Sequence, residues 1–139
     1  MDVLGVLLGY LKEEWPNVID PGDGVLVVTF DTTACFIKPS DFPQGRTVVS
    51  IRAPILMGVR PSPVLYELVA TRSASFQIGT VALQKEGELN VEFSYGVLAD
   101  GLTAPTLNQL VRIVGTTADE LHFKWKEAFG GRSVYESGR

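Results

Sequence analysis

The chain has 139 residues, of which 45% are hydrophobic and 20% are charged, and its formal net charge is −4. This length suits one domain that buries about two thirds of its unfolded surface. The lysines and arginines are scattered singly, so nucleic acid is excluded as an expected partner, while the high apolar content favours self-association.

The cysteine and histidine content limits redox and metal chemistry. Cys35 is the only cysteine, so no internal disulfide can form, and one thiol with one histidine cannot build a zinc site of the usual kind. We therefore expect no metal, no cofactor and a location in the reducing cytoplasm. The N-terminal run VLGVLLGYL is too short to span a bilayer, and Asp2 stands where a signal peptide would carry positive charge, so no membrane association is expected.

The first half of the chain predicts one helix and three strands. A helix over residues 2–15 begins at the N-cap Asp2 and stops before Pro16. After a turn at residues 21–24, β-branched residues predict strands over 25–31, 33–38 and 46–56. Pro54 cannot donate to a strand ladder, so it marks a sheet edge, a bulge or the end of its strand.

The second half predicts a helix, a hairpin and a longer helix. Ser62 and Pro63 are typical of a helix start, and residues 76–99 alternate around a turn at residues 85–87. Residues 104–129 form a long amphipathic pattern with Thr103 as its cap, in which Gly115 is a position where the helix can bend. The chain is therefore expected to form one α+β domain over residues 1–129, with an antiparallel sheet, helices packed mainly on one face and a flexible tail over 130–139.

Three residues are candidates for chemistry, and each has a structural interpretation. Asp100 with the following glycine is typical of a turn between a strand and a helix. His122 lies on the apolar stripe of the last helix, and Cys35 lies in an apolar strand without a cation to stabilise its thiolate. No nucleophile elbow, phosphate loop or paired-cysteine motif is present, so catalytic and metal sites are not expected; a small enzyme using Asp100 and His122 stays as a remote alternative.

The sheet itself offers a surface for a partner. If the helices cover the face that carries Leu26, Val28 and Ile51, the opposite face is half apolar and could hold a peptide or a second subunit. A loop or the second helix of the same chain could equally cover it. The candidate residues of this surface are Val25, Val27, Thr29, Val48, Ser50 and Arg52.

Three stretches carry a family resemblance. FQIGTVAL, LADGLTAPTLNQLV and TADEL at residues 117–121 resemble the YbjN-like family, which is related to type III secretion chaperones and is also described as peptide-binding chaperone (TY-Chap) domains. The likeness covers residues 25–125. It implies an α-β(3)-α-β(2)-α fold, frequent homodimers, a role in holding a peptide segment of a client protein, and no cofactor or catalytic residues.

These observations favour a cytoplasmic, non-enzymatic, chaperone-like domain that binds client peptides as a homodimer. Strand addition at a sheet edge, combined with shallow apolar pockets, would supply the binding. The alternative is a regulatory or scaffolding interaction domain on the same sheet that binds a folded partner and no client peptide.

Overall fold

The order of the elements is the one that the sequence predicts. The computed structural model describes residues 2–136 and contains three helices and a five-stranded sheet. The elements are α1 (Val3–Lys12), β1 (Leu26–Thr29), β2 (Ala34–Phe42), β3 (Arg46–Met57), α2 (Pro63–Arg72), β4 (Thr80–Glu86), β5 (Glu88–Leu98) and α3 (Ala104–Phe129). The predicted α-β(3)-α-β(2)-α fold of the α+β class is confirmed.

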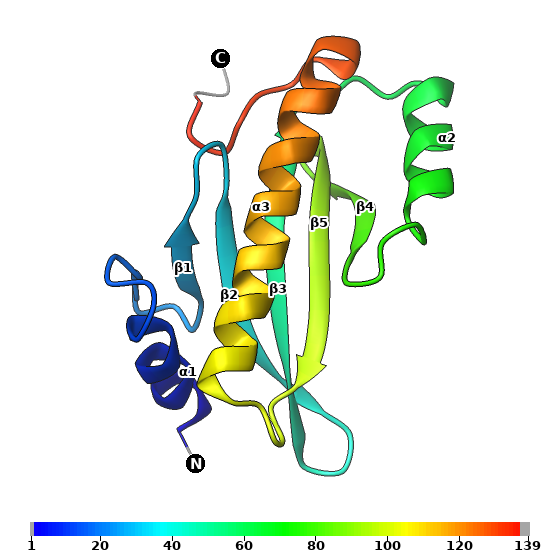
Figure 1. Ribbon diagram of the computed structural model, residues 1–139. Coiled ribbons are helices and arrows are strands. Elements are labelled where there is room, and N and C mark those ends of the chain that lie inside the picture. The colour runs from blue at the N-terminus through cyan, green and yellow to red at the C-terminus, as the bar shows by residue number, and fades with distance from the viewer. Residues whose placement is uncertain (1, 137–139) are drawn as a thin grey trace.

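The sheet is antiparallel throughout, with strand order β1-β2-β3-β5-β4. Figure 1 shows α3 lying along one face of this sheet, with α1 beside its first turns and α2 next to β4. The helices therefore cover mainly one face. We refer to the opposite face, which turns away from α3, as the open face.

Residue alternation along the strands separates the two faces. In β3, Val49, Ile51 and Ala53 are fully buried, whereas Ser50 and Arg52 between them are only partly buried. The buried set packs against the apolar stripe of α3, so the core lies between the sheet and its helices. Its largest fully buried side chains include Phe93, Leu7, Leu11, Leu26, Ile37, Ile51, Ile55, Leu56, Leu65 and Leu107.

Two strands are longer than predicted, and a proline lies inside each. β2 continues through Pro39, which pairs with Val49 of β3. The last pair between β1 and β2 is Leu26 with Ile37, so the missing N–H of Pro39 interrupts no ladder on that side. β3 continues past Pro54 with a register shift between Pro54 and Leu56, which resolves the three options for this proline in favour of a bulge.

The helix starts follow the predicted capping residues. Asp2 accepts a hydrogen bond from the Gly5 N–H at 3.0 Å, Ser62 accepts one from Leu65 at 3.1 Å, and Thr103 accepts one from Thr106 at 3.3 Å. The end of α1 differs from the prediction, because the helix stops at Lys12 and not at Trp15.

The chain after α3 returns to the sheet. We call residues 130–136 the C-terminal segment; the sequence predicts that they belong to a flexible tail outside the domain. Met57 and Arg132 exchange two backbone hydrogen bonds, each of 2.9 Å, and Ser133 is buried. In the structure this segment is therefore in contact with the end of β3, as Figure 1 shows.

Candidate functional site

The open face is hollowed into a groove of about 340 Å³ over its middle strands. The groove crosses the sheet from the start of β1 to β4, and the C-terminal segment borders one end. Its walls combine apolar and charged side chains, so it suits a ligand peptide that carries both apolar and charged residues. The lining residues are Val25, Phe36, Lys38, Ser50, Arg52, Pro54, Met57, Gln84, Glu86, Asn90, Glu92 and Val134.

The groove brings together three of the six residues predicted for a partner surface, namely Val25, Ser50 and Arg52. Val27 lies between two buried residues and Val48 precedes the buried Val49, but neither lines the groove. Thr29 borders a separate small hollow with Trp15 and Asn17. The predicted surface is thus divided between the groove and the region around β1.

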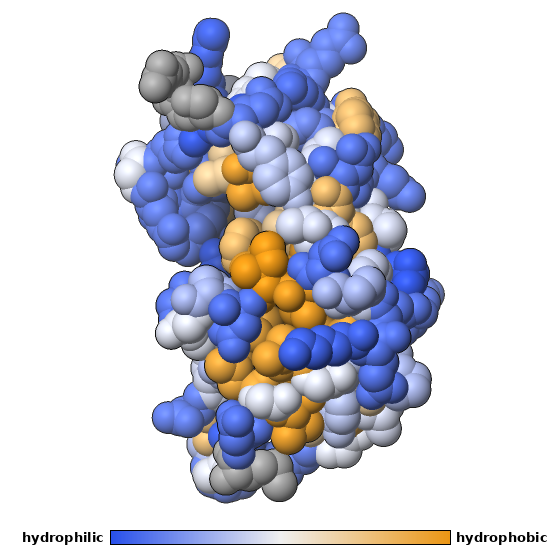
Figure 2. All heavy atoms as spheres, turned by 90° about the vertical axis from the view of Figure 1, so that its left-hand side faces the viewer, coloured by the Kyte–Doolittle hydropathy of each residue, from blue (hydrophilic) through white to orange (hydrophobic). Residues whose placement is uncertain are grey.

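The outer edge of β1 is also apolar. Figure 2 shows hydrophobic residues gathered on the side of the molecule where α1 and β1 lie. Ile19 is 48% exposed there and exchanges two backbone hydrogen bonds with Val27. This bridge occupies part of the strand edge, so a partner would meet side chains here more than free backbone groups.

One ion pair crosses the floor of the groove. The Arg52 guanidinium donates to one oxygen of Glu92 through Nη2 at 2.9 Å and through Nε at 3.3 Å. The side chain of Glu92 is 12% exposed and that of Arg52 is 44% exposed, so the carboxylate is covered while the guanidinium still reaches solvent. A ligand in the groove would therefore meet a cation beside the aromatic side chain of Phe36, which is the cross-strand neighbour of Arg52.

Most of the groove's other residues were not predicted from the sequence. Phe36 alternates with the buried Cys35 and Ile37, so the strand pattern could have placed it on the open face. Glu92 needs the register between β3 and β5, in which Pro54 lies opposite it, and no local pattern gives that register. Val134 comes from the C-terminal segment, which local sequence signals do not connect with the sheet.

The open edge of the sheet at β4 is a second feature suited to peptide binding. β4 pairs with β5 alone, and within residues 2–136 no further backbone hydrogen bond involves β4. An unpaired strand edge can accept an extended chain through main-chain hydrogen bonds.

The remote enzyme hypothesis fails on geometry. Asp100 is exposed in the turn before α3, where it borders a hollow of about 530 Å³ together with Val3, Val6 and Tyr10. His122 lies far along α3, and a helix rises about 1.5 Å per residue, so about 27 Å of helix separates it from that turn. The two side chains cannot act on one substrate.

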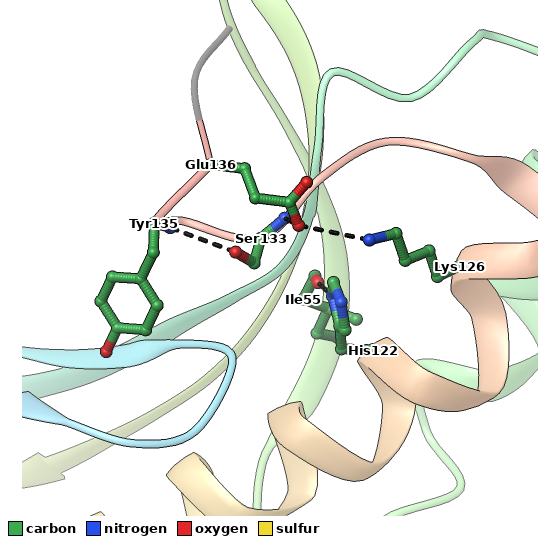
Figure 3. A network of polar contacts seen from close by, with 6 residues as sticks. All are labelled: Ile55, His122, Lys126, Ser133, Tyr135 and Glu136. Carbon is green, nitrogen blue, oxygen red and sulfur yellow. Dashed lines mark hydrogen bonds and ion pairs between the residues drawn. The ribbon is translucent and has the colours of Figure 1, made fainter.

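His122 and Cys35 have structural surroundings. His122 is 3% exposed, and its Nδ1 donates to the carbonyl oxygen of Ile55 at 2.7 Å (Figure 3). The thiol of Cys35 is fully buried and points to the carbonyl of Val111, and this burial raises its pKa far above the ordinary value. A thiol in this state is a poor nucleophile.

Residues 2–136 contain no group of three or more histidine, cysteine, aspartate or glutamate side chains placed to hold a metal ion. Within the same residues, no helix has the length and apolar character needed to cross a bilayer.

Comparisons with known proteins agree with this architecture. Residues 6–137 match the family model TY-Chap1, described as T3SS (YopN, CesT) and YbjN peptide-binding chaperone 1. No curated protein matches the chain. Among solved structures, YbjN from E. coli, described as a candidate transcription regulator, superposes with a TM-score of 0.64 at 16% identity, over 89% of this chain and 91% of YbjN. At this identity the likeness shows the fold.

Proposed function

The chain belongs to the TY-Chap1 family of peptide-binding chaperone domains, and from this premise we propose that it is a non-enzymatic chaperone-like domain that holds an extended peptide segment of a client protein. The observation that carries the proposal is the groove on the open face, because the fold leaves one face of an antiparallel sheet without a helix and hollows it.

The groove suits an extended, mainly apolar peptide with an occasional carboxylate. Val25 and Phe36 offer apolar contact at the β1–β2 side, and Arg52 offers a partly exposed guanidinium next to them. Gly96 of β5 lies beside the groove as the cross-strand neighbour of Ser50, and a Cβ built there would come no closer than 3.8 Å to Val48. A peptide backbone can approach the sheet closely at such a glycine.

Main-chain pairing would add affinity at the edge of β4. Its unpaired backbone can take up a client segment as a sixth strand, while side chains of that client reach apolar surface nearby. Affinity would then come from hydrogen bonds that any extended sequence can make, and selectivity from the groove.

We further propose that the protein acts as a homodimer in the cytoplasm. The apolar surface around the outer edge of β1, where Ile19 is exposed and Val27 is half-buried, is the kind of surface that a second subunit covers. The buried free thiol of Cys35 is compatible with a reducing compartment.

The test is selection of random twelve-residue peptides on the purified protein, followed by affinity measurement with a Gly96→Val variant. The Cβ of this valine meets no atom closer than 3.8 Å, so the fold should persist, while the added side chain next to Ser50 obstructs a peptide in the groove and binding should fall about tenfold. Ala128→Val is the matched control, because Ala128 is exposed on α3 away from the open face. A chain that is monomeric at micromolar concentration and selects no peptide contradicts the proposal.

The second candidate is a regulatory interaction domain that binds one folded partner. It is favoured by the fold likeness to YbjN, which is described as a candidate transcription regulator. A pull-down that returns one folded protein, together with a peptide selection that yields no consensus, supports this candidate against the first.

A further inference from the structure

The C-terminal segment joins the sheet through a single antiparallel β-bridge at Arg132 and then turns over residues 133–136. β2 pairs with β3 only as far as Arg52, so the last residues of β3 have a free edge on that side. Arg132 takes this edge: its N–H donates to the Met57 carbonyl, and its carbonyl accepts from the Met57 N–H, both at 2.9 Å. This is the hydrogen-bond pattern of strand addition, made here by the protein's own chain.

The side chains of the segment make contacts of three kinds. The Arg132 guanidinium pairs with both oxygens of Glu88, with one N···O distance of 2.9 Å. Val134 lines the end of the groove. The hydroxyl of Tyr135 reaches the carbonyl oxygens of Phe30 and Thr33 in the β1–β2 turn, at 3.2 and 2.5 Å. Figure 3 shows this tyrosine directed toward the turn.

The backbone of the segment fits its position closely. Gly131 has φ of 81°, and a Cβ at this residue would lie 2.8 Å from the Met57 carbonyl oxygen. A side chain here would therefore push the segment off β3. Glu136 then folds back to accept from the Ser133 N–H at 3.1 Å and from Lys126 at 3.2 Å (Figure 3).

The exposure of the C-terminal segment would allow it to dissociate from the sheet. Tyr135 is 53% exposed, and both side chains of the Lys126–Glu136 ion pair are exposed, at 45% and 48%; in the second ion pair Glu88 is 37% exposed and Arg132 is 21% exposed. Only Ser133 is buried among its residues. Exposed ion pairs contribute little to stability, so removal of the segment would leave the core intact.

We propose that the C-terminal segment is an internal ligand of a peptide site at the end of the groove, formed by the free edge of β3, Glu88 and the β1–β2 turn. Client peptides would share its chemistry: a glycine and a basic residue at the β3 edge, followed by a small polar residue, an aliphatic residue and a tyrosine in a turn. The inference rests on the proposed function for the identity of the client. A client of this kind would pair with Met57, place its cation on Glu88 and its tyrosine hydroxyl on the β1–β2 turn.

An internal ligand weakens binding of the same sequence from solution. A tethered segment acts at an effective concentration of about 1 mM, so a peptide with an intrinsic dissociation constant of about 100 µM binds the intact chain about tenfold more weakly. Removing the segment's side chains should therefore strengthen binding of the free peptide about tenfold.

The experiment uses the full-length chain and a fluorescent synthetic peptide, GGRSVYE, which copies residues 130–136. Anisotropy titrations compare the wild type with a variant carrying Arg132→Ser, Val134→Ser and Tyr135→Ser. The control variant is Phe123→Ser, which removes an aromatic ring that is 64% exposed on α3. The control peptide EGYSRGV has the same composition in scrambled order.

We expect GGRSVYE to bind the triple variant about tenfold more tightly than it binds the wild type or Phe123→Ser, and EGYSRGV to bind all three weakly. Equal affinity of GGRSVYE for the wild type and the triple variant, or equal affinity of both peptides, overturns the inference. If GGRSVYE binds as expected but random-peptide selection on the triple variant yields no competitor, the internal ligand stands and the client-binding function fails.

A second variant covers the case in which the triple variant does not fold. Tyr135→Phe removes only the hydroxyl, which loosens the segment by the loss of its hydrogen bonds to the turn. GGRSVYE should bind this variant about two- to tenfold more tightly than the wild type, and the peptide GGRSVFE should bind it more weakly than GGRSVYE does. An unchanged affinity in this variant also overturns the inference.

Discussion

Gly115 in the middle of α3 provides a sharp test of how the helix packs on the sheet. α3 runs unbroken through this residue, and Gly115 is buried. A Cβ built on it would lie 2.3 Å from two ring atoms of Phe30 and 2.5 Å from a third. The glycine therefore makes room for the phenyl ring, which also contacts the ring of Trp15 at a centroid distance of 5.4 Å. Space for this ring is a sufficient reason for the glycine, and no bend in α3 is needed.

Gly115→Ala combines two opposing effects. Alanine favours the helix by about 1 kcal/mol, whereas overpacking against the ring costs about 1–3 kcal/mol. We expect a net loss of about 1 kcal/mol in the free energy of unfolding. In a Phe30→Ala background the ring is gone, so the same substitution should stabilise the protein by up to about 1 kcal/mol. The coupling energy between the two positions should be about 1–3 kcal/mol.

Urea denaturation of the wild type, the two single variants and the double variant measures this cycle. A change of sign for Gly115→Ala between the two backgrounds is the expected result. A stability change of the same sign and size in both backgrounds would show that the Phe30 ring does not pack on Gly115. It would then refute the contact between α3 and the β1–β2 turn at this position.

Three further variants or conditions test other contacts. Asp119 accepts from the N–H groups of Asp31 and Thr32 and from the Thr32 hydroxyl, so Asp119→Ala should cost about 1–3 kcal/mol in urea unfolding, whereas Glu120→Ala next to it should cost almost nothing. His122→Leu leaves the Ile55 carbonyl without its donor and should cost about 1–3 kcal/mol, with Phe123→Leu as the exposed control. The ion pair with Arg132 lowers the pKa of Glu88, and hydrogen bonds from the Ser133 N–H and then from Lys126 lower the pKa of Glu136. Both contributions are therefore complete above the ordinary glutamate pKa and are lost as the pH falls through the lowered values. Below about pH 4, hydrogen exchange at the Met57 amide should accelerate relative to that at Val49, and equal acceleration at both amides would contradict the role of these carboxylates.

The sequence predicted the fold where the signals are local. The caps at Asp2, Ser62 and Thr103 depend on residues within one helical turn, and all three are confirmed. The same is true of the hairpin turn at Gly87, whose φ of 77° suits glycine. Strand ends were harder to predict, because Pro39 and Pro54 are tolerated only through the arrangement of neighbouring strands, and that arrangement is a property of the whole sheet.

In the candidate site, too, the features set by local sequence were predicted and those set by long-range pairing were not. Alternation correctly placed Ser50 and Arg52 on the face opposite the core, because the strand period is local. The partner of Arg52 is Glu92, forty positions away, and the ion pair depends on a register that only the folded sheet defines. The sequence pattern therefore gave the face, and the structure was needed to locate the groove within it.

The position of the C-terminal segment depends entirely on long-range contacts with the folded sheet. With two glycines at its start and few apolar residues, it has no helix or strand pattern of its own, so sequence reasoning placed it outside the domain. Each contact that holds it to the sheet, at Met57, Glu88, Phe30 and Thr33, comes from a surface that other elements have already built. A segment that needs the domain for its order, while the core of the domain does not need it, can be exchanged for another peptide with little loss of stability. That asymmetry is the physical condition for competition between an internal ligand and a client.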